Sequence, residues 1–185
     1  MGDYTFEMDY WGNCCNTFDE SQKHYVYARY MGLDRTHYSF DVHGKSILDI
    51  GGGPDSMLLK TINLNFGLVV DPIEYPSWTI MRYRAHNIGV SVIRGEDLVC
   101  DGWDEVWIYN CLQHCDDAER VIHNALMAGN KLRIFEWINV PPHDGHPIML
   151  TKELLDKWIG LPGGQVVHLA EQGCYGTAFY GVYGG

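Results

Sequence analysis

The feature that most constrains the fold is a glycine cluster directly after a short apolar run. Residues 46–50 read Ser-Ile-Leu-Asp-Ile, and Gly51, Gly52 and Gly53 follow at once. A run of this length and composition predicts a buried strand. Glycines let the backbone turn tightly, approach a ligand closely and aim the amide groups of a following helix at it. The segment therefore predicts a strand, a tight turn and a binding site beyond the strand.

Short apolar runs alternate with helical patterns along the rest of the chain. Helices are expected at residues 18–31, 54–64, 77–86, 117–127 and 151–159, and strands at 46–50, 67–71, 90–93, 105–109, 131–138, 165–169 and 177–183. Near-continuous apolar strands that alternate with helices are typical of a mostly parallel sheet covered on both faces. The last two strands are close enough in sequence to pair as an antiparallel hairpin.

The predicted fold class is therefore α/β, with a doubly wound, seven-stranded, mostly parallel sheet that ends in a C-terminal antiparallel hairpin. A chain of 185 residues has the length of one domain. We expect a single domain over residues 1–185, with an N-terminal cap and helix in 1–45 and the core in 46–185. Only residues 95–104 separate the third and fourth strands, which is too few for the usual intervening helix.

The charge and the hydropathy pattern exclude several kinds of partner. The formal net charge of −11 repels phosphate backbones, so no nucleic-acid partner is expected. No apolar run approaches the roughly 18 residues that a membrane span needs, so no membrane partner is expected. The first residues show neither a basic leader nor an apolar core. These features predict a soluble, cytoplasmic protein, and they indicate no oligomeric state.

An acidic residue stands at the end of the second predicted strand. Asp71 follows Gly53 by 18 residues, in the order strand, glycine turn, helix, strand, acid. A carboxylate in that place can accept hydrogen bonds from both hydroxyls of a ribose. A tight turn without a ligand is the alternative for the glycines alone, and the downstream acid disfavours it. Together these features predict a nucleoside-binding crevice.

The pattern around the glycines distinguishes between nucleoside cofactors. A dinucleotide fingerprint has apolar residues before its first glycine and a third glycine where this chain has Ser56. Here Asp49 precedes the glycines. The segment instead resembles motif I of the class I S-adenosylmethionine-dependent methyltransferases, an acid followed by alternating glycines, in Asp49, Gly51 and Gly53. It departs from that motif at Asp55, where a third glycine would stand.

The resemblance continues through the chain and implies S-adenosylmethionine as the cofactor. Asp71 matches the ribose-binding acid of the family, and residues 95–98 match its adenine-binding segment. Residues 104–109 resemble the fourth-strand motif, and 110–114 resemble the loop that faces the methyl group. The terminal hairpin is also typical of the family. The cofactor-binding residues that the resemblance implies are Asp49, Gly51, Gly52, Gly53, Asp71, Glu96, Asp97 and Asn110, with Asp97 preferred to Glu96 for the adenine amine.

A histidine is the candidate catalytic group. His114 lies beyond the carboxyl end of the fourth predicted strand, where ligands bind in such sheets. A neutral imidazole there is suited to act as a general base for a protonated nucleophile. The alternative is a histidine that caps a helix or packs in the core. His146 is a second candidate for catalysis.

Further residues are expected to cover the substrate. Trp11 belongs to an N-terminal segment of aromatic and amide side chains, which suits a ligand cover, although it could equally pack on the outer helices. Gln113 and His143 are expected at the substrate or in its lid. His143 and His146, with Asp144 between them, could form a metal site, but no geometry supports one and we assign no metal.

The resemblance implies an enzyme that transfers a methyl group to a small molecule or an accessible protein side chain. Residues 110–113 lack the acid or amide, two prolines and aromatic that mark amino-methyltransferases of DNA, which argues against DNA bases as substrates. Three alternatives stay open. They are an enzyme that uses the cofactor for aminopropyl transfer or cleavage, a catalytically silent cofactor-binding subunit, and a nicotinamide-dependent reductase, which Asp49 and the terminal hairpin disfavour.

Overall fold

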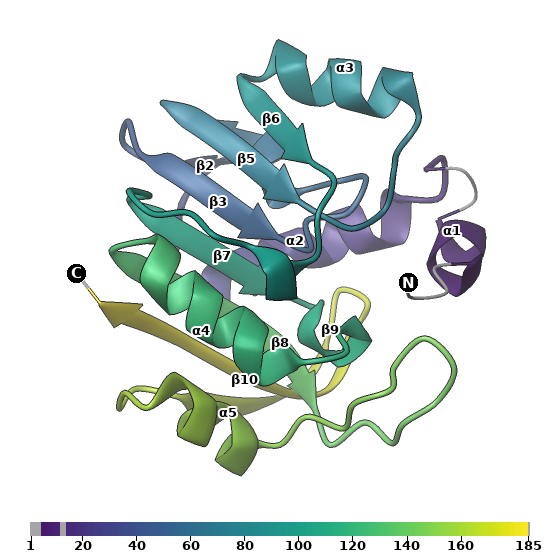
Figure 1. Ribbon diagram of the computed structural model, residues 1–185, viewed down its shortest axis with the longest axis vertical. Helices are drawn as coiled ribbons and strands as arrows, with labels where there is room; N and C mark the ends of the chain where they lie inside the picture. The colour runs from purple at the N-terminus through teal and green to yellow at the C-terminus, as the bar shows by residue number, and fades with distance from the viewer. Residues whose placement is uncertain (1–4, 12–13, 185) are drawn as a thin grey trace.

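The computed structural model describes residues 5–11 and 14–184. A sheet of seven strands runs through its centre, as Figure 1 illustrates. The strands are β3 (Ser46–Ile50), β5 (Phe66–Val70), β6 (Ile88–Ser91), β7 (Glu105–Tyr109), β8 (Lys131–Ile138), β9 (Gln165–Glu171) and β10 (Cys174–Gly184). Their order in the sheet is β6-β5-β3-β7-β8-β10-β9. The first five strands in this order, β6, β5, β3, β7 and β8, pair in parallel. Strand β10 pairs antiparallel with both β8 and β9. The predicted fold class is confirmed.

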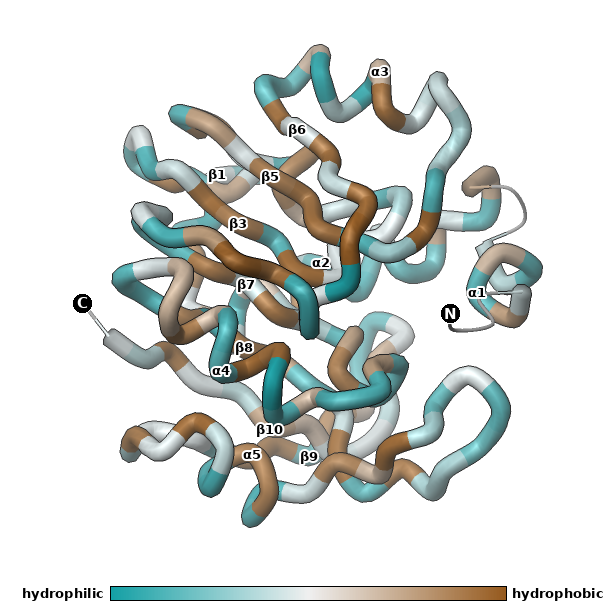
Figure 2. Tube along the Cα trace, in the orientation of Figure 1, coloured by the Kyte–Doolittle hydropathy of each residue, from teal (hydrophilic) through white to brown (hydrophobic). Residues whose placement is uncertain are grey.

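Helices cover both faces of this sheet. The helices are α1 (Thr5–Tyr10), α2 (Phe18–Tyr30), α3 (Ser77–Ala85), α4 (Ala118–Ala128) and α5 (Lys152–Ile159). Helices α4 and α5 pack on one face, where Val121 and Leu155 join a core with Leu48 of β3. Helices α2 and α3 contribute to the core on the other face. Figure 2 shows the central strands as the most continuous apolar stretches, as expected for strands buried on both sides.

The helix predicted from Pro54 onwards is wrong. The segment forms only a 3-10 turn, η1 (Met57–Lys60), followed by the short strand β4 (Thr61–Ile62). Met57 and Leu58 are buried, but Ile62 is 40% exposed, so the apolar spacing does not extend along one helical face. Strand β4 instead pairs with β2 (Ser39–Asp41), which pairs with β1 (Asp34–Thr36). This small second sheet was not predicted because its strands are short and mostly polar.

The bounds of the third strand also differ from the prediction. Residues 90–93 were expected, whereas β6 covers Ile88–Ser91. Ile88 is the buried residue of the strand, while Val92 and Ile93 are exposed beyond its end. The short connection over residues 95–104 contains only the single turn η2 (Gly95–Asp97), in agreement with its length. In the described parts of the chain, no helix has both the length and the apolarity that a membrane crossing requires.

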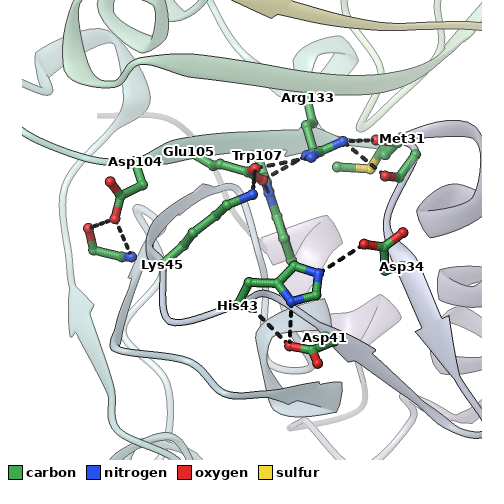
Figure 3. A network of polar contacts seen from close by, with 11 residues as sticks. Met31, Asp34, Asp41, His43, Lys45, Asp104, Glu105, Trp107 and Arg133 are labelled. Carbon is green, nitrogen blue, oxygen red and sulfur yellow. Dashed lines mark hydrogen bonds and ion pairs between the residues drawn. The ribbon is translucent and has the colours of Figure 1, made fainter. Parts of the chain in front are cut away.

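A buried carboxylate ties the strands together at the amino end of β7 (Figure 3). Glu105 accepts hydrogen bonds from Lys45 Nζ at 2.6 Å, from Arg133 Nε at 2.7 Å and from Trp107 Nε1 at 3.0 Å. Burial raises the pKa of Glu105, but the hydrogen bonds from Arg133 and Lys45 outweigh burial and lower it to about 2. Because Glu105 is the first residue of β7, this cluster braces the sheet at the opposite end of the strand from the cavity described next.

Candidate functional site

A cavity of about 710 Å³ lies beyond the carboxyl ends of β3, β5 and β7. That is the edge of a doubly wound sheet where ligands bind, and the volume falls within the range of ligand pockets. Ten of the expected site residues line it: Trp11, Gly51, Gly53, Asp71, Glu96, Asn110, Gln113, His114, His143 and His146. The other three, Asp49, Gly52 and Asp97, are described residues that lie outside its lining.

The turn after β3 has a backbone that only glycine adopts without strain. Gly51 has φ of +74° and Gly53 has φ of +64°, both in the left-handed region. A Cβ atom on Gly51 would lie 2.5 Å from the Cβ of Cys111, so a side chain has no room there. The amide of Gly53 donates to Oδ2 of Asp71 at 3.2 Å. The glycine turn is therefore held against the end of β5 with its backbone at the cavity.

Asp49 supports this turn from inside the protein. Its Oδ2 accepts hydrogen bonds from the hydroxyl of Tyr109, at 2.6 Å, and from that of Ser56. A Cβ atom on Gly52 would lie 2.5 Å from the same oxygen, so Gly52 lets the turn fold over the carboxylate. Burial raises the pKa of Asp49 to about 7. The structure thus gives Asp49 and Gly52 a role in shaping the turn.

Asp71 presents its carboxylate at the end of β5. Its Oδ1 accepts from the amide of Ile73 at 3.0 Å, while Oδ2 accepts from Gly53. The Tyr75 hydroxyl also interacts with this carboxylate, whose four lone pairs exceed these partners, so it can still accept a hydrogen bond from a ligand. Burial raises the pKa of Asp71 to about 6.

The two acids of the predicted adenine segment differ in position. Glu96 lines the cavity, and its Oε1 accepts from Arg94 at 2.9 Å and from the amide of Asp116 at 3.0 Å. Asp97 is exposed and is not part of the cavity lining. The preference for Asp97 over Glu96 has no support from these positions.

A buried glutamate shapes the loop that follows β7. Glu136 of β8 is fully buried, and its Oε1 accepts from the amides of Cys111 at 3.0 Å and Leu112 at 3.1 Å. Burial raises the pKa of Glu136 to about 7. These hydrogen bonds fix the backbone between Asn110 and His114, which both face the cavity. Glu136 was not among the expected site residues.

Three histidines and one glutamate gather on the α1 side of the cavity. The Nδ1 of His114 lies 2.8 Å from Oε1 of Glu7, as an ion pair. The rings of His114 and His146 lie 4.4 Å apart between centroids, edge to face, and those of His143 and His146 lie 4.2 Å apart. No group of three or more His, Cys, Asp or Glu side chains within residues 5–11 and 14–184 is arranged to hold a metal ion.

The two candidate histidines differ in their protonation. Burial lowers the pKa of His114, but Glu7 outweighs burial and raises it above its ordinary value. Burial, His114 and His143 together lower the pKa of His146 to about 4. Of the two candidates, His114 is therefore the stronger base, and His146 is the residue whose neutral form is more strongly favoured.

Helix α1 and a tight hairpin cover this part of the cavity. In the hairpin, the amides of His143 and His146 each donate to the carbonyl of the other, at 3.1 and 2.9 Å. Gly145, with φ of +86°, packs so closely on Phe6 that a Cβ atom would lie 2.4 Å from its ring. Trp11, the residue directly after this helix, approaches Gly53. The two segments therefore form one cover, in which Glu7 reaches His114.

Sequence reasoning missed Glu7, Glu20, Lys23 and Glu136. The first three reach the cavity from α1 and α2, and Glu136 acts on it through backbone amides. None belongs to a motif, because each meets its partner only through the tertiary fold. A polar residue at an inward position of a buried strand, such as Glu136 in β8, is the one signal that the sequence offered.

The fold is shared with solved methyltransferases. A chain of the Haloferax volcanii complex between the Trm112 methyltransferase activator and its methyltransferase superposes with a TM-score of 0.63 at 13% identity, over 97% of this chain and 96% of that one. An S-adenosylmethionine-dependent methyltransferase of Thermotoga maritima gives 0.61 at 12%, over 96% and 95%. The dimethyltransferase RosA of Streptomyces davawensis gives 0.56 at 15%, over 88% of this chain and 55% of RosA.

No protein-family model matches the sequence, and no curated protein matches it either. At these identities the structural likeness shows the fold. The strand order, the terminal antiparallel hairpin and the cavity position define the Rossmann-like fold of the class I methyltransferases. The chain spans almost the full length of the first two proteins, and about half, 55%, of RosA.

Proposed function

We propose that this protein is an S-adenosylmethionine-dependent methyltransferase that acts on a small molecule or an accessible protein side chain. One observation carries the proposal: a single cavity is lined both by the glycine turn with Asp71 and by the His114 and Glu7 pair. The first pair of features suits a nucleoside, and the second suits proton removal from a nucleophile.

The residues of the cavity fit the cofactor. The left-handed backbone of Gly51 and Gly53 permits close approach, and the Asp71 carboxylate keeps lone pairs for ribose hydroxyls. Glu96 and Asn110 line the same cavity and would border the nucleoside and the methyl group. When bound, the cofactor supplies an electrophilic methyl group on a positively charged sulfur.

The main task of the protein is then to align the nucleophile and exclude water. The cover formed by α1 and the hairpin at residues 143–146 contacts His114 through Glu7 and His146, with Phe6 packed on Gly145. Trp11, directly after α1, and His143, in the hairpin, line the cavity and are the proposed substrate or lid residues. Residues 1–45 serve in this proposal as a cap on a core of residues 46–185.

His114 is the proposed general base. Glu7 lies 2.8 Å from Nδ1, and we assign to Nε2 the role of taking a proton from the nucleophile. A carboxylate beside Nδ1 both orients the ring and stabilises its protonated form, and the raised pKa of His114 reflects this. His146 is the second candidate, and its lowered pKa makes it the weaker base.

The partners in this proposal are a small-molecule or protein substrate, with no nucleic acid and no membrane. The net charge of −11 supports the exclusion of nucleic acid, and a cytoplasmic location stays a prediction. One structural neighbour comes from a complex with an activator protein. Co-purification from the native host would test whether this chain binds a partner protein. A catalytically silent subunit is expected to co-purify with such a partner.

Product analysis with methyl-labelled S-adenosylmethionine tests the reaction. The proposal predicts label in an acceptor from the host extract together with S-adenosylhomocysteine. Methylthioadenosine as the product would instead establish aminopropyl transfer or cleavage. Tight cofactor binding with no turnover, and with a second chain bound, would establish the silent subunit. The variant His114→Gln should slow transfer by about 100-fold at neutral pH if the base is required.

A further inference from the structure

A chain of side-chain hydrogen bonds enters the cavity from α2 and fixes the direction of two amides. Glu20 is buried and accepts from Lys23 Nζ and from the Tyr27 hydroxyl, both at 2.9 Å. It also accepts from Asn110 Nδ2 at 3.0 Å. All three partners are donors, so the carboxylate of Glu20 acts only as an acceptor. Asn110 must therefore direct its nitrogen toward Glu20 and its oxygen away from it.

The direction of Asn110 determines that of Gln113. The Oδ1 of Asn110 accepts from Nε2 of Gln113 at 3.0 Å. If Gln113 were reversed, two oxygens would face each other without a proton between them. Glu20 thus sets the polarity of both amides, although it contacts only the first.

The outcome is a buried oxygen without a donor, on a residue that lines the cavity. Gln113 lines the cavity and is 3% exposed, and its Oε1 has no hydrogen-bond partner among the residues that the structure describes. A buried acceptor that lacks a donor destabilises a protein, so such an atom is suited to accept a hydrogen bond from a ligand that reaches it. His146 also lines the cavity, and its Nδ1 has no hydrogen-bond partner within residues 5–11 and 14–184.

We propose that Gln113 selects a methyl acceptor whose reacting group carries a proton, a hydroxyl or an N–H, by accepting a hydrogen bond from that group through Oε1 in the bound complex, before the proton passes to His114. This inference rests on the proposed function, because it takes the cavity to hold the methyl acceptor. A group without a proton, such as an ether, a tertiary amine or a carboxylate, leaves Oε1 unpaired or repelled. Selection by one buried acceptor of this kind is strong, because the wrong ligand loses the hydrogen bond without any compensation.

Small aromatic probes suit this cavity, because Phe6, Tyr10 and Trp137 also line it. Phenol and aniline carry a donor, while anisole and N,N-dimethylaniline are the corresponding compounds without one. Ligand-observed NMR titrations would give the dissociation constant of each probe, with and without S-adenosylhomocysteine. The proposal predicts that phenol binds about tenfold more tightly than anisole to the wild type, and aniline more tightly than N,N-dimethylaniline.

Two variants attribute the preference to Gln113. Gln113→Met removes the acceptor at similar volume, and the ratio of the phenol and anisole dissociation constants should approach one. Tyr27→Phe removes the hydroxyl that Tyr27 donates to Glu20 but leaves the direction of both amides unchanged. The ratio of the two dissociation constants in this variant should therefore equal that of the wild type. Thermal unfolding of both variants identifies any general loss of structure.

Equal binding of phenol and anisole to the wild type would overturn the proposal, and so would no binding of either donor probe. An unchanged ratio in Gln113→Met would overturn it as well. Calorimetry on the same samples reports cofactor binding separately. If S-adenosylhomocysteine does not bind but the preference for phenol is present, the proposed function fails while the role of Gln113 as an acceptor stands.

Discussion

The Nδ1 of His114 lies 2.8 Å from Oε1 of Glu7, which joins the loop after β7 to the short helix α1. Helix α1 contains no buried residue, and this ion pair helps to hold it over the cavity. The same carboxylate raises the pKa of His114. The cover and the proposed base are therefore coupled through Glu7.

The variant Glu7→Gln should lower the pKa of His114. Without the carboxylate, burial is the main influence on the ring, and burial disfavours the charged form. The C–H resonances of His114, followed by NMR as a function of pH, would measure the change. Glu119→Gln, at an exposed position of α4, is the matched control and should leave the titration unchanged. A His114 titration that is identical in Glu7→Gln and the wild type would contradict the ion pair.

Buried carboxyl groups should make the free protein less stable as the pH rises. The pKa values of Asp49 and Glu136 are raised to about 7, and that of Asp71 to about 6. A raised pKa means that the folded state binds more protons than the unfolded state. The stability that these groups contribute is therefore fully present below pH 4 and is lost as the pH rises to about 7.

Denaturant unfolding between pH 5 and 8 measures this decrease in the free energy of unfolding. Each unit of pKa shift corresponds to roughly 1.4 kcal/mol. Asp49→Asn keeps an oxygen for the hydroxyls of Ser56 and Tyr109 but does not titrate, so its stability should fall less steeply with pH. The exposed Asp97→Asn should follow the wild type. Parallel curves for Asp49→Asn and the wild type would show that Asp49 does not titrate in this range.

Glu105 should show the opposite dependence. Its pKa is lowered to about 2, so its contribution is present above its unfolded value near 4.5 and is lost as the pH falls toward 2. Glu105→Gln should lower the free energy of unfolding by about 3 kcal/mol at pH 7, because Lys45 and Arg133 lose a buried counter-ion. The difference from the wild type should shrink on acidification, and a difference independent of pH would contradict the ionised cluster of Figure 3.

Gly51→Ala should disrupt the glycine turn. A methyl group at this position meets the Cβ of Cys111 at 2.5 Å and also strains a backbone with φ of +74°. Gly102 has a similar φ of +84° with no atom within 4 Å of an added Cβ, so Gly102→Ala carries the backbone strain alone. The melting temperature should fall more for Gly51→Ala than for Gly102→Ala. Equal decreases would mean that the turn is not packed against Cys111.

The sequence predicted the central sheet well because its strands are bounded apolar runs. The expected bounds of β7 and β8 are those observed, since each run begins and ends at clear polar or turn residues. The segment after Pro54 was mistaken for a helix because four apolar residues at helical spacing also fit a 3-10 turn followed by a strand. Such short elements depend on their neighbours more than on their own pattern.

The cofactor side of the candidate site follows from local motifs, whereas the acceptor side does not. Gly51, Gly53 and Asp71 are positioned by strands whose ends the sequence already indicates. Glu7 and Glu20 come from α1 and α2 and meet His114 and Asn110 only in the folded protein. No periodicity or spacing links residues so far apart in the sequence.

Binding of S-adenosylmethionine and S-adenosylhomocysteine, measured by calorimetry, tests the central claim most directly. The wild type, Asp71→Ala and the exposed control Asp97→Ala would be compared, with nicotinamide dinucleotides as negative controls. The proposal predicts micromolar binding of both sulfur compounds to the wild type and to Asp97→Ala, and at least tenfold weaker binding to Asp71→Ala, equivalent to about 1.4 kcal/mol. Absence of binding to the wild type, or binding that Asp71→Ala leaves unchanged, would contradict the assignment of this cavity.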